Sequence, residues 1–87
     1  MGYVYVFRAE HKYKVGQTLD LARRFNEIKS YEPNLEFCFA AHVPNHSVIE
    51  RTIHQVFWHK RQWPTEWFTL SNIDLFEIKL YLNSICG

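Results

Sequence analysis

The sequence predicts a protein of the α/β (α+β) class, with a small, mainly antiparallel three-stranded sheet flanked by helices. The chain of 87 residues has the length of one domain. Hydrophobic residues make up 47% of it and aromatic residues 17%, which excludes a disordered or collagen-like chain. Segments of strand composition alternate with segments of helical periodicity, and no repeat or linker divides them. We therefore expect a single domain over residues 1–87.

The first two strands are expected to form a hairpin. Residues 3–8 are aromatic or β-branched at each apolar position, and residues 13–16 follow after a polar stretch. Side chains alternate between the two faces of a strand. We expect the valines of the first strand to face the core, opposite Tyr3, Tyr5 and Phe7.

A helix is predicted over residues 21–30, because Leu21, Phe25 and Ile28 recur at helical spacing. Thr18 or Asp20 can cap its first turn. On a helical wheel, Arg23 projects away from the apolar stripe, whereas Arg24 flanks it. The two arginines are therefore not equivalent.

A strand is predicted over residues 35–43 from its apolar composition, and Pro44 ends it. Ser47 with Glu50 three residues later is a capping-box pattern that opens a second helix, which we expect to end near Lys60. Glu50 lies at the edge of the apolar face of this helix, where a carboxylate needs a hydrogen bond, a cation or a metal. Capping the Ser47 N–H is the alternative role.

The last elements are a short strand-like segment over residues 66–70 and a helix over residues 74–84, capped by Ser71 or Asn72. One apolar stripe of this helix should close the core. Phe76 and Leu80 form another stripe on nearly the opposite side, which predicts a homodimer through these two residues. The alternative is that they pack under residues 63–70.

The charge of the chain is nearly balanced, at +1, unlike that of a stand-alone tight nucleic-acid binder. Residues 1–29 carry six basic and three acidic groups, so an anionic partner is expected at the N-terminal third. Cys38 and Cys86 lack metal or redox spacing, and no signal peptide or long apolar segment is present. We expect a cytoplasmic protein, or one in the host-cell cytoplasm if it is phage-encoded, with no membrane contact.

Four polar residues stand out against a purely structural role, and together they resemble a site: Tyr5, Lys14, Arg24 and Glu50. The alternative for the first two is an ordinary cross-strand pair on a solvated sheet face.

These residues resemble the motifs of the GIY-YIG nucleases. Tyr3-Val4-Tyr5, Lys14-Val15-Gly16 and Arg24 look like the opening of such a domain, and the resemblance spans most of the chain. Residues 50–54, followed by Glu66-Trp67-Phe68, are similar to a phage and fungal branch named for a meiotically up-regulated gene. Tyr3 replaces the first glycine of the family pattern, and Lys14 replaces a tyrosine.

The resemblance implies a metal-dependent endonuclease that hydrolyses DNA by a single-metal mechanism. Glu50 would hold one Mg²⁺ or Mn²⁺ ion, because these ions prefer oxygen ligands. Arg24 would offer its planar fork to phosphate oxygens. Tyr5 would take the proton from the attacking water, with Lys14 or the metal lowering the pKa of its phenol. His54 would contact the scissile phosphate or orient Glu50.

Other readings stay open. A catalytically weak or inactive DNA-binding or protein-interaction module on the same fold is the alternative function. A zinc site of His46, Glu50 and His54 is conceivable from their spacing. Further substrate contacts are expected at Tyr3, Tyr13, Gly16, Lys60 and Arg61.

Around these last two cations, Trp58 and Trp63 could stack on bases while the cations follow a phosphate backbone. The alternative is a helix end favoured by cations, with both tryptophans in the core.

Overall fold

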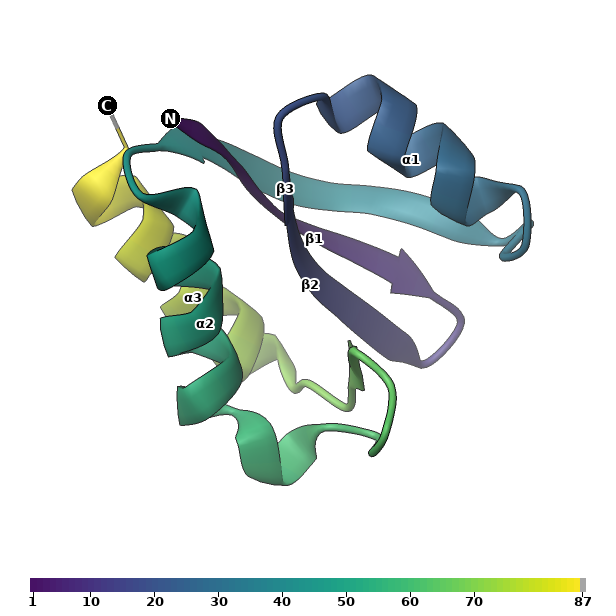
Figure 1. The fold of residues 1–87 in the computed structure, drawn as a ribbon. Coiled ribbons are helices and arrows are strands. Elements are labelled where there is room, and N and C mark those ends of the chain that lie inside the picture. Colours follow the sequence, from purple (N-terminus) through teal and green to yellow (C-terminus); the bar gives the residue numbers. More distant parts are fainter. Residues whose placement is uncertain (87) are drawn as a thin grey trace.

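The structure, a computed structural model that describes residues 1–86, is an antiparallel sheet with helices on both faces (Figure 1). Within these residues the sheet has four strands in the order β3-β1-β2-β4. The elements follow the chain as β1 (Gly2–Ala9), β2 (Lys12–Thr18), α1 (Leu21–Lys29), β3 (Leu35–Val43), α2 (His46–Val56), the 3₁₀ turn η1 (Trp58–Lys60), β4 (Trp67–Phe68) and α3 (Asn72–Ile85). The α+β class is confirmed.

The expectation of a three-stranded sheet is wrong, because the short segment Trp67–Phe68 joins the sheet as β4. It pairs antiparallel with Tyr13 and Lys14 of β2. The remainder of β2, from Val15 to Thr18, has no strand on that side in the described part of the chain.

Helices α2 and α3 cover one face of the sheet, here called the α2–α3 face, and α1 covers the other, called the α1 face (Figure 1). The valines of the hairpin pack on the α2–α3 face, as predicted: Val4, Val6 and Val15 are fully buried. The α1 face is not solvated either, since Tyr5 and Phe7 are buried there. The alternative of a solvated cross-strand pair is wrong, and the register pairs Tyr5 with Gly16 rather than with Lys14.

Two predicted elements are confirmed closely. Helix α1 begins after Asp20, whose carboxylate accepts a hydrogen bond from the Arg23 N–H at 3.1 Å. The helix ends at Lys29, one residue earlier than predicted, and β3 covers residues 35–43 as predicted.

The predicted capping box at the start of the second helix is wrong. Asn45 precedes α2 in the left-handed region, at φ 52°, and makes no side-chain cap. The Ser47 hydroxyl instead donates to Gln17 Oε1 at 2.9 Å. The helix ends at Val56, because the backbone leaves helical geometry at Phe57, and η1 follows before Lys60 is reached. Glu50 is therefore not part of a capping box.

Helix α3 begins at a capping box of Ser71 and Asp74, and Lys60 forms an ion pair with the Asp74 carboxylate. Phe76 and Leu80 are exposed, so the alternative that they pack under residues 63–70 is wrong. The homodimer through these two residues stays a prediction. None of the helices in residues 1–86 has both the length and the apolar character needed to span a bilayer.

Candidate active site

The residues predicted to form a site meet where β2 is exposed at the edge of the sheet. Tyr5 approaches this edge across the α1 face, because its ring lies over Gly16 of the neighbouring strand. A Cβ atom at position 16 would overlap the Tyr5 Oη and Cζ atoms. Glycine at this position is what lets the phenol reach the edge.

Arg24 holds the phenol from helix α1. Its Nε donates a hydrogen bond to Tyr5 Oη at 3.3 Å. Arg24 is half-buried and Arg23 is exposed, so the predicted difference between the two arginines is confirmed. The bond uses Nε, so the fork can still present its terminal nitrogens to a phosphate oxygen.

The pKa of Tyr5 lies above its ordinary value. Burial raises it most, the hydrogen bond and charge of Arg24 lower it, and the carboxylates of Glu66 and Glu50 raise it further. The expectation that Lys14 lowers this pKa is therefore replaced, because Arg24 is the cation that acts on the phenol. At neutral pH the phenol is protonated.

Lys14 is a buried cation beside Tyr5, with 9% of its side chain exposed. Its Nζ lies 3.9 Å from Glu66 Oε2 and 5.5 Å from the centroid of the Trp67 ring. Burial lowers the pKa of Lys14, the charge of Glu66 partly restores it, and Arg24 lowers it further. Burial thus works against the charged form of this ammonium, at a cost in folding stability.

Glu50 reaches the same edge from α2, together with His54. His54 Nε2 lies 3.3 Å from Glu50 Oε1 and 2.7 Å from the Val15 carbonyl oxygen. A carbonyl can only accept, so Nε2 carries the ring proton. Burial raises the pKa of Glu50; the charge of His54 lowers it, Glu66 raises it, and a hydrogen bond from Gln17 lowers it.

Gln17 was not predicted as a site residue. It follows Gly16 on β2 and contacts α2 through both Ser47 and Glu50. Its one sequence signal is a polar side chain that shares a strand face with the buried Val15. The role of this side chain can be inferred only when the packing of α2 against β2 is known.

The donor set at Glu50 fits a hard divalent cation held by one carboxylate. In residues 1–86, no group of three or more His, Cys, Asp and Glu side chains is arranged to hold a metal ion. The His46 ring packs against Gly2 instead, so the alternative zinc site is not formed. Glu50 is half-buried and lies near the second carboxylate of Glu66, which raises its pKa. A cation would relieve this repulsion, and Mg²⁺ retains most of its waters when it binds one carboxylate.

Glu50 opens into a hollow of about 500 Å³, here called the Glu50 pocket. Gln17, His54, Trp58 and Arg61 also line it. Arg61, one of the predicted substrate contacts, therefore lies beside Glu50, and its contact with substrate stays a prediction. Its neighbour Lys60 does not line this pocket, because it is engaged by Asp74.

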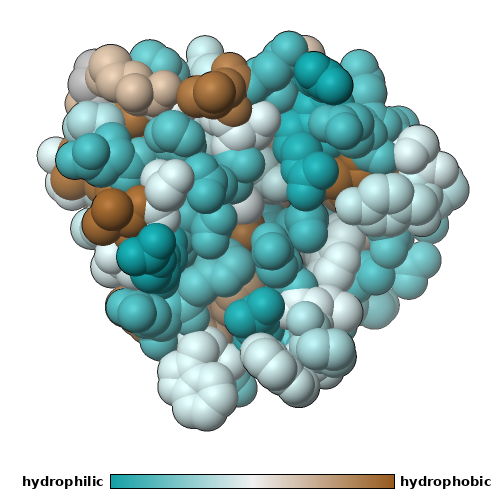
Figure 2. Space-filling model, viewed as in Figure 1, coloured by the Kyte–Doolittle hydropathy of each residue, from teal (hydrophilic) through white to brown (hydrophobic). Residues whose placement is uncertain are grey.

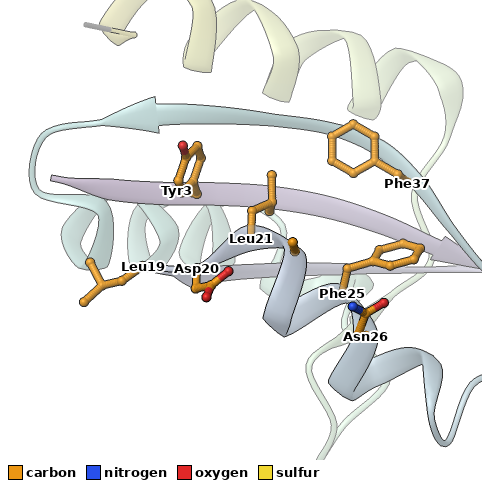
Figure 3. Close-up of a pocket in the computed structure, with 8 residues that line it drawn as sticks. Tyr3, Leu19, Asp20, Leu21, Phe25, Asn26 and Phe37 are labelled. Carbon is orange, nitrogen blue, oxygen red and sulfur yellow. The ribbon is translucent and has the colours of Figure 1, made fainter.

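The other predicted substrate contacts are divided between the two faces. Tyr13 lies on the α2–α3 face, packed against the core, away from Tyr5. Tyr3 lies on the α1 face, two residues from Tyr5, in an open groove of about 690 Å³ (Figure 3). Figure 3 shows Leu21 and Phe25 of α1 and Phe37 of β3 around this groove.

The comparisons with known proteins correct the family suggested by the motifs. The family model described as T5orf172 domain matches residues 2–86, and this is a different family from the GIY-YIG nucleases, although both are phage-associated, endonuclease-like domains. The sequence motifs reflect a local arrangement, such as a tyrosine ring that lies over a glycine. Such an arrangement does not distinguish the two families. Among curated proteins and among solved structures, none matches the chain.

The matched family covers nearly all of the described chain. It is a family of small nuclease-like and DNA-binding domains, which is consistent with a nuclease or DNA-binding role. The chain belongs to the T5orf172 domain family.

Proposed function

We propose that the chain is an endonuclease that hydrolyses DNA phosphodiester bonds at the edge of β2, with Glu50 holding one Mg²⁺ or Mn²⁺ ion. The observation that carries this proposal is the convergence of a phenol, a guanidinium, a buried ammonium and a carboxylate from separate elements of the fold. Phosphodiester hydrolysis needs such groups, because water must lose a proton while negative charge grows on the phosphate and the leaving oxygen. A divalent cation, when bound, supplies positive charge to that phosphate.

Arg24 and Lys14 stabilise the growing charge in this proposal. Arg24 contacts phosphate oxygens with its terminal nitrogens while Nε holds the Tyr5 phenol. Lys14 supplies a fixed positive charge from within the protein, where the low dielectric strengthens its effect on the phosphate.

Tyr5 takes the proton from the attacking water in its ionised form. Since burial raises its pKa, the ionised fraction is small at neutral pH. Below that pKa, this fraction grows about tenfold with each unit by which the pH rises. The hydrogen bond from Arg24 favours the ionised phenol. His54 keeps the Glu50 carboxylate in place through its Nε2 proton, which it shares with the Val15 carbonyl oxygen.

The proposal is tested by cleavage of supercoiled and branched DNA with Mg²⁺ or Mn²⁺. Glu50→Gln keeps the shape of the side chain and removes the charge, and Glu36→Gln makes the same change at an exposed position of β3. We expect Glu50→Gln to lose about 100-fold or more of the rate, as do other losses of a charge-stabilising group, while Glu36→Gln cuts normally.

Two outcomes would contradict the proposal. A Glu50→Gln protein that cuts at the normal rate removes Glu50 from the mechanism. Wild-type protein that binds DNA but cuts none of these substrates identifies a DNA-binding module without catalysis.

A further inference from the structure

Two tryptophans are exposed close to the Glu50 pocket. Trp58 is 69% exposed and Trp63 is 78% exposed, whereas Trp67 is 8% exposed. The alternative that the first two lie in the core is therefore wrong. In Figure 2, side chains of nearly neutral hydropathy project at the end of the molecule where η1 and the following loop lie. An indole ring left in water forgoes the large apolar burial that this side chain provides in a core.

Trp58 and Trp63 are linked to the candidate active site through Arg61. Trp58 and Arg61 both line the Glu50 pocket. The Arg61 guanidinium carbon lies 5.1 Å from the centroid of the Trp63 ring, and Arg61 Nε donates to the Thr65 carbonyl oxygen. These contacts hold the arginine between the pocket and the second indole.

The chemistry of this surface favours a nucleic-acid strand over a protein partner. A protein that docks through apolar contacts requires a contiguous apolar patch. Here the polar residues His59, Arg61 and Gln62 lie between the two tryptophans in the sequence. Aromatic rings interleaved with cations are what single strands bind, because every base has a π face and every link has a phosphate. Bases inside a duplex already stack on each other, so only unpaired bases can stack on these rings.

We propose that the DNA entering the Glu50 pocket has unpaired bases beside the scissile phosphate, and that these bases stack on Trp58 and Trp63 while Arg61 contacts the backbone. The substrate class is then single-stranded DNA, or the unpaired part of a branched molecule. The inference rests on the proposed function for the identity of the site.

Tryptophan fluorescence tests the stacking independently of cleavage. Wild-type protein without divalent ions is titrated with an oligothymidylate of about eight nucleotides, within the usual site size of single-strand binders. We expect strong quenching, since two of the three tryptophans would stack, and weaker quenching by an abasic strand of equal length. Equal quenching by both strands would overturn the inference.

Substitutions sharpen this test. Trp58→Leu and Trp63→Leu should each weaken oligothymidylate binding by about 5- to 150-fold, the effect of losing one stacked base. Phe76→Leu alters a similarly exposed aromatic ring on α3 and should bind normally. Binding by the two tryptophan variants that matches wild type would overturn the inference.

The inference and the proposed function can fail separately. If the tryptophan variants cut fully paired plasmid and oligothymidylate as wild type does, stacking is overturned and the nuclease stands. If stacking is observed but Glu50→Gln cuts normally, the proposed mechanism fails, while a surface for unpaired bases remains.

Discussion

The two faces of the sheet are both buried, but they bury different kinds of side chain. On the α2–α3 face the hairpin contributes valines, which meet isoleucines and leucines of α2 and α3. On the α1 face the same hairpin contributes Tyr5, Phe7 and Lys14, and α1 adds Arg24. One hairpin thus contributes valines to an apolar core on one side and polar side chains of the candidate site on the other, while Glu50 joins that site from α2.

The two faces therefore differ in what their buried side chains do to folding stability. Apolar burial contributes about 25 cal/mol for each Å² removed from water. Buried charge works against folding unless it is paired. Burial moves the pKa of Tyr5 up and that of Lys14 down, so both neutral forms are favoured. Holding these buried ionisable groups on the α1 face therefore costs folding stability.

The largest expected effect is a loss of stability on the α2–α3 face. Ile78 is 1% exposed on α3, and Ile78→Ala should lower the free energy of unfolding by about 2–5 kcal/mol, because a cavity replaces the side chain. Urea unfolding measures the loss. Cleavage per folded molecule should not change, and a fall in that quantity would show that the two faces are coupled.

The matching change on the α1 face should affect catalysis instead. Arg24→Ala removes the donor to Tyr5 and should slow cleavage by about 100- to 1,000-fold, the usual cost of losing one preorganised donor. Arg23→Ala changes an exposed neighbour and should cut normally. Equal rates for the two variants would show that the role given to Arg24 is wrong.

Gly16→Ala tests the close approach of the two hairpin strands at the site. The added methyl group would overlap the phenol of Tyr5, so the ring must move. We expect a loss of about 1–3 kcal/mol in stability, as for other overpacked sites, together with a loss of cleavage. A stable and active Gly16→Ala protein would remove Tyr5 from its assigned position.

A smaller effect is expected at Asp74, where a charge stabilises the fold. Burial raises the pKa of Asp74, but hydrogen bonds from Lys60 and Ser71 outweigh it and leave the pKa below its ordinary value. The stabilisation is therefore present above the unfolded pKa of about 3.9 and is lost as pH falls through the folded pKa. Asp74→Asn should cost about 1 kcal/mol at neutral pH, the worth of a helix cap.

Unfolding of Asp74→Asn and wild type at neutral and at strongly acidic pH checks this prediction. The difference in stability between them should shrink in acid, since the wild-type carboxyl is then protonated. A difference that is independent of pH would assign the effect to packing.

The parts of the fold that sequence could predict are those determined by local patterns. Helix α1 and strand β3 follow from periodicity, from composition and from the Asp20 cap. The strand-like segment over residues 66–70 was predicted, but its place in the sheet was not, because Trp67–Phe68 pair with β2 only where the tertiary fold brings them there. The capping box at Ser47 failed because Asn45 adopts a left-handed conformation before α2.

In the candidate site, too, only the features that depend on local sequence could be predicted. The position of Arg24 on α1 followed from a helical wheel, since its neighbours in sequence determine it. The hydrogen-bond partner of Tyr5 could not be predicted from the sequence. Lys14 belongs to the same hairpin as Tyr5 and was the expected neighbour, but Arg24 of α1 donates the hydrogen bond. The exposure of Trp58 and Trp63 also depends on tertiary packing, which leaves η1 outside the core.

The pH dependence of cleavage by wild type and Tyr5→Phe tests the central claim most directly. The Phe ring keeps the stacking on Phe7, where the Tyr5 and Phe7 ring centroids lie 4.1 Å apart, so the variant should stay folded. We predict a wild-type rate that rises about tenfold for each pH unit above neutrality, and a variant that is slower by at least about 100-fold at each of these pH values. A Tyr5→Phe protein with a near-normal rate and the same pH profile would contradict the account.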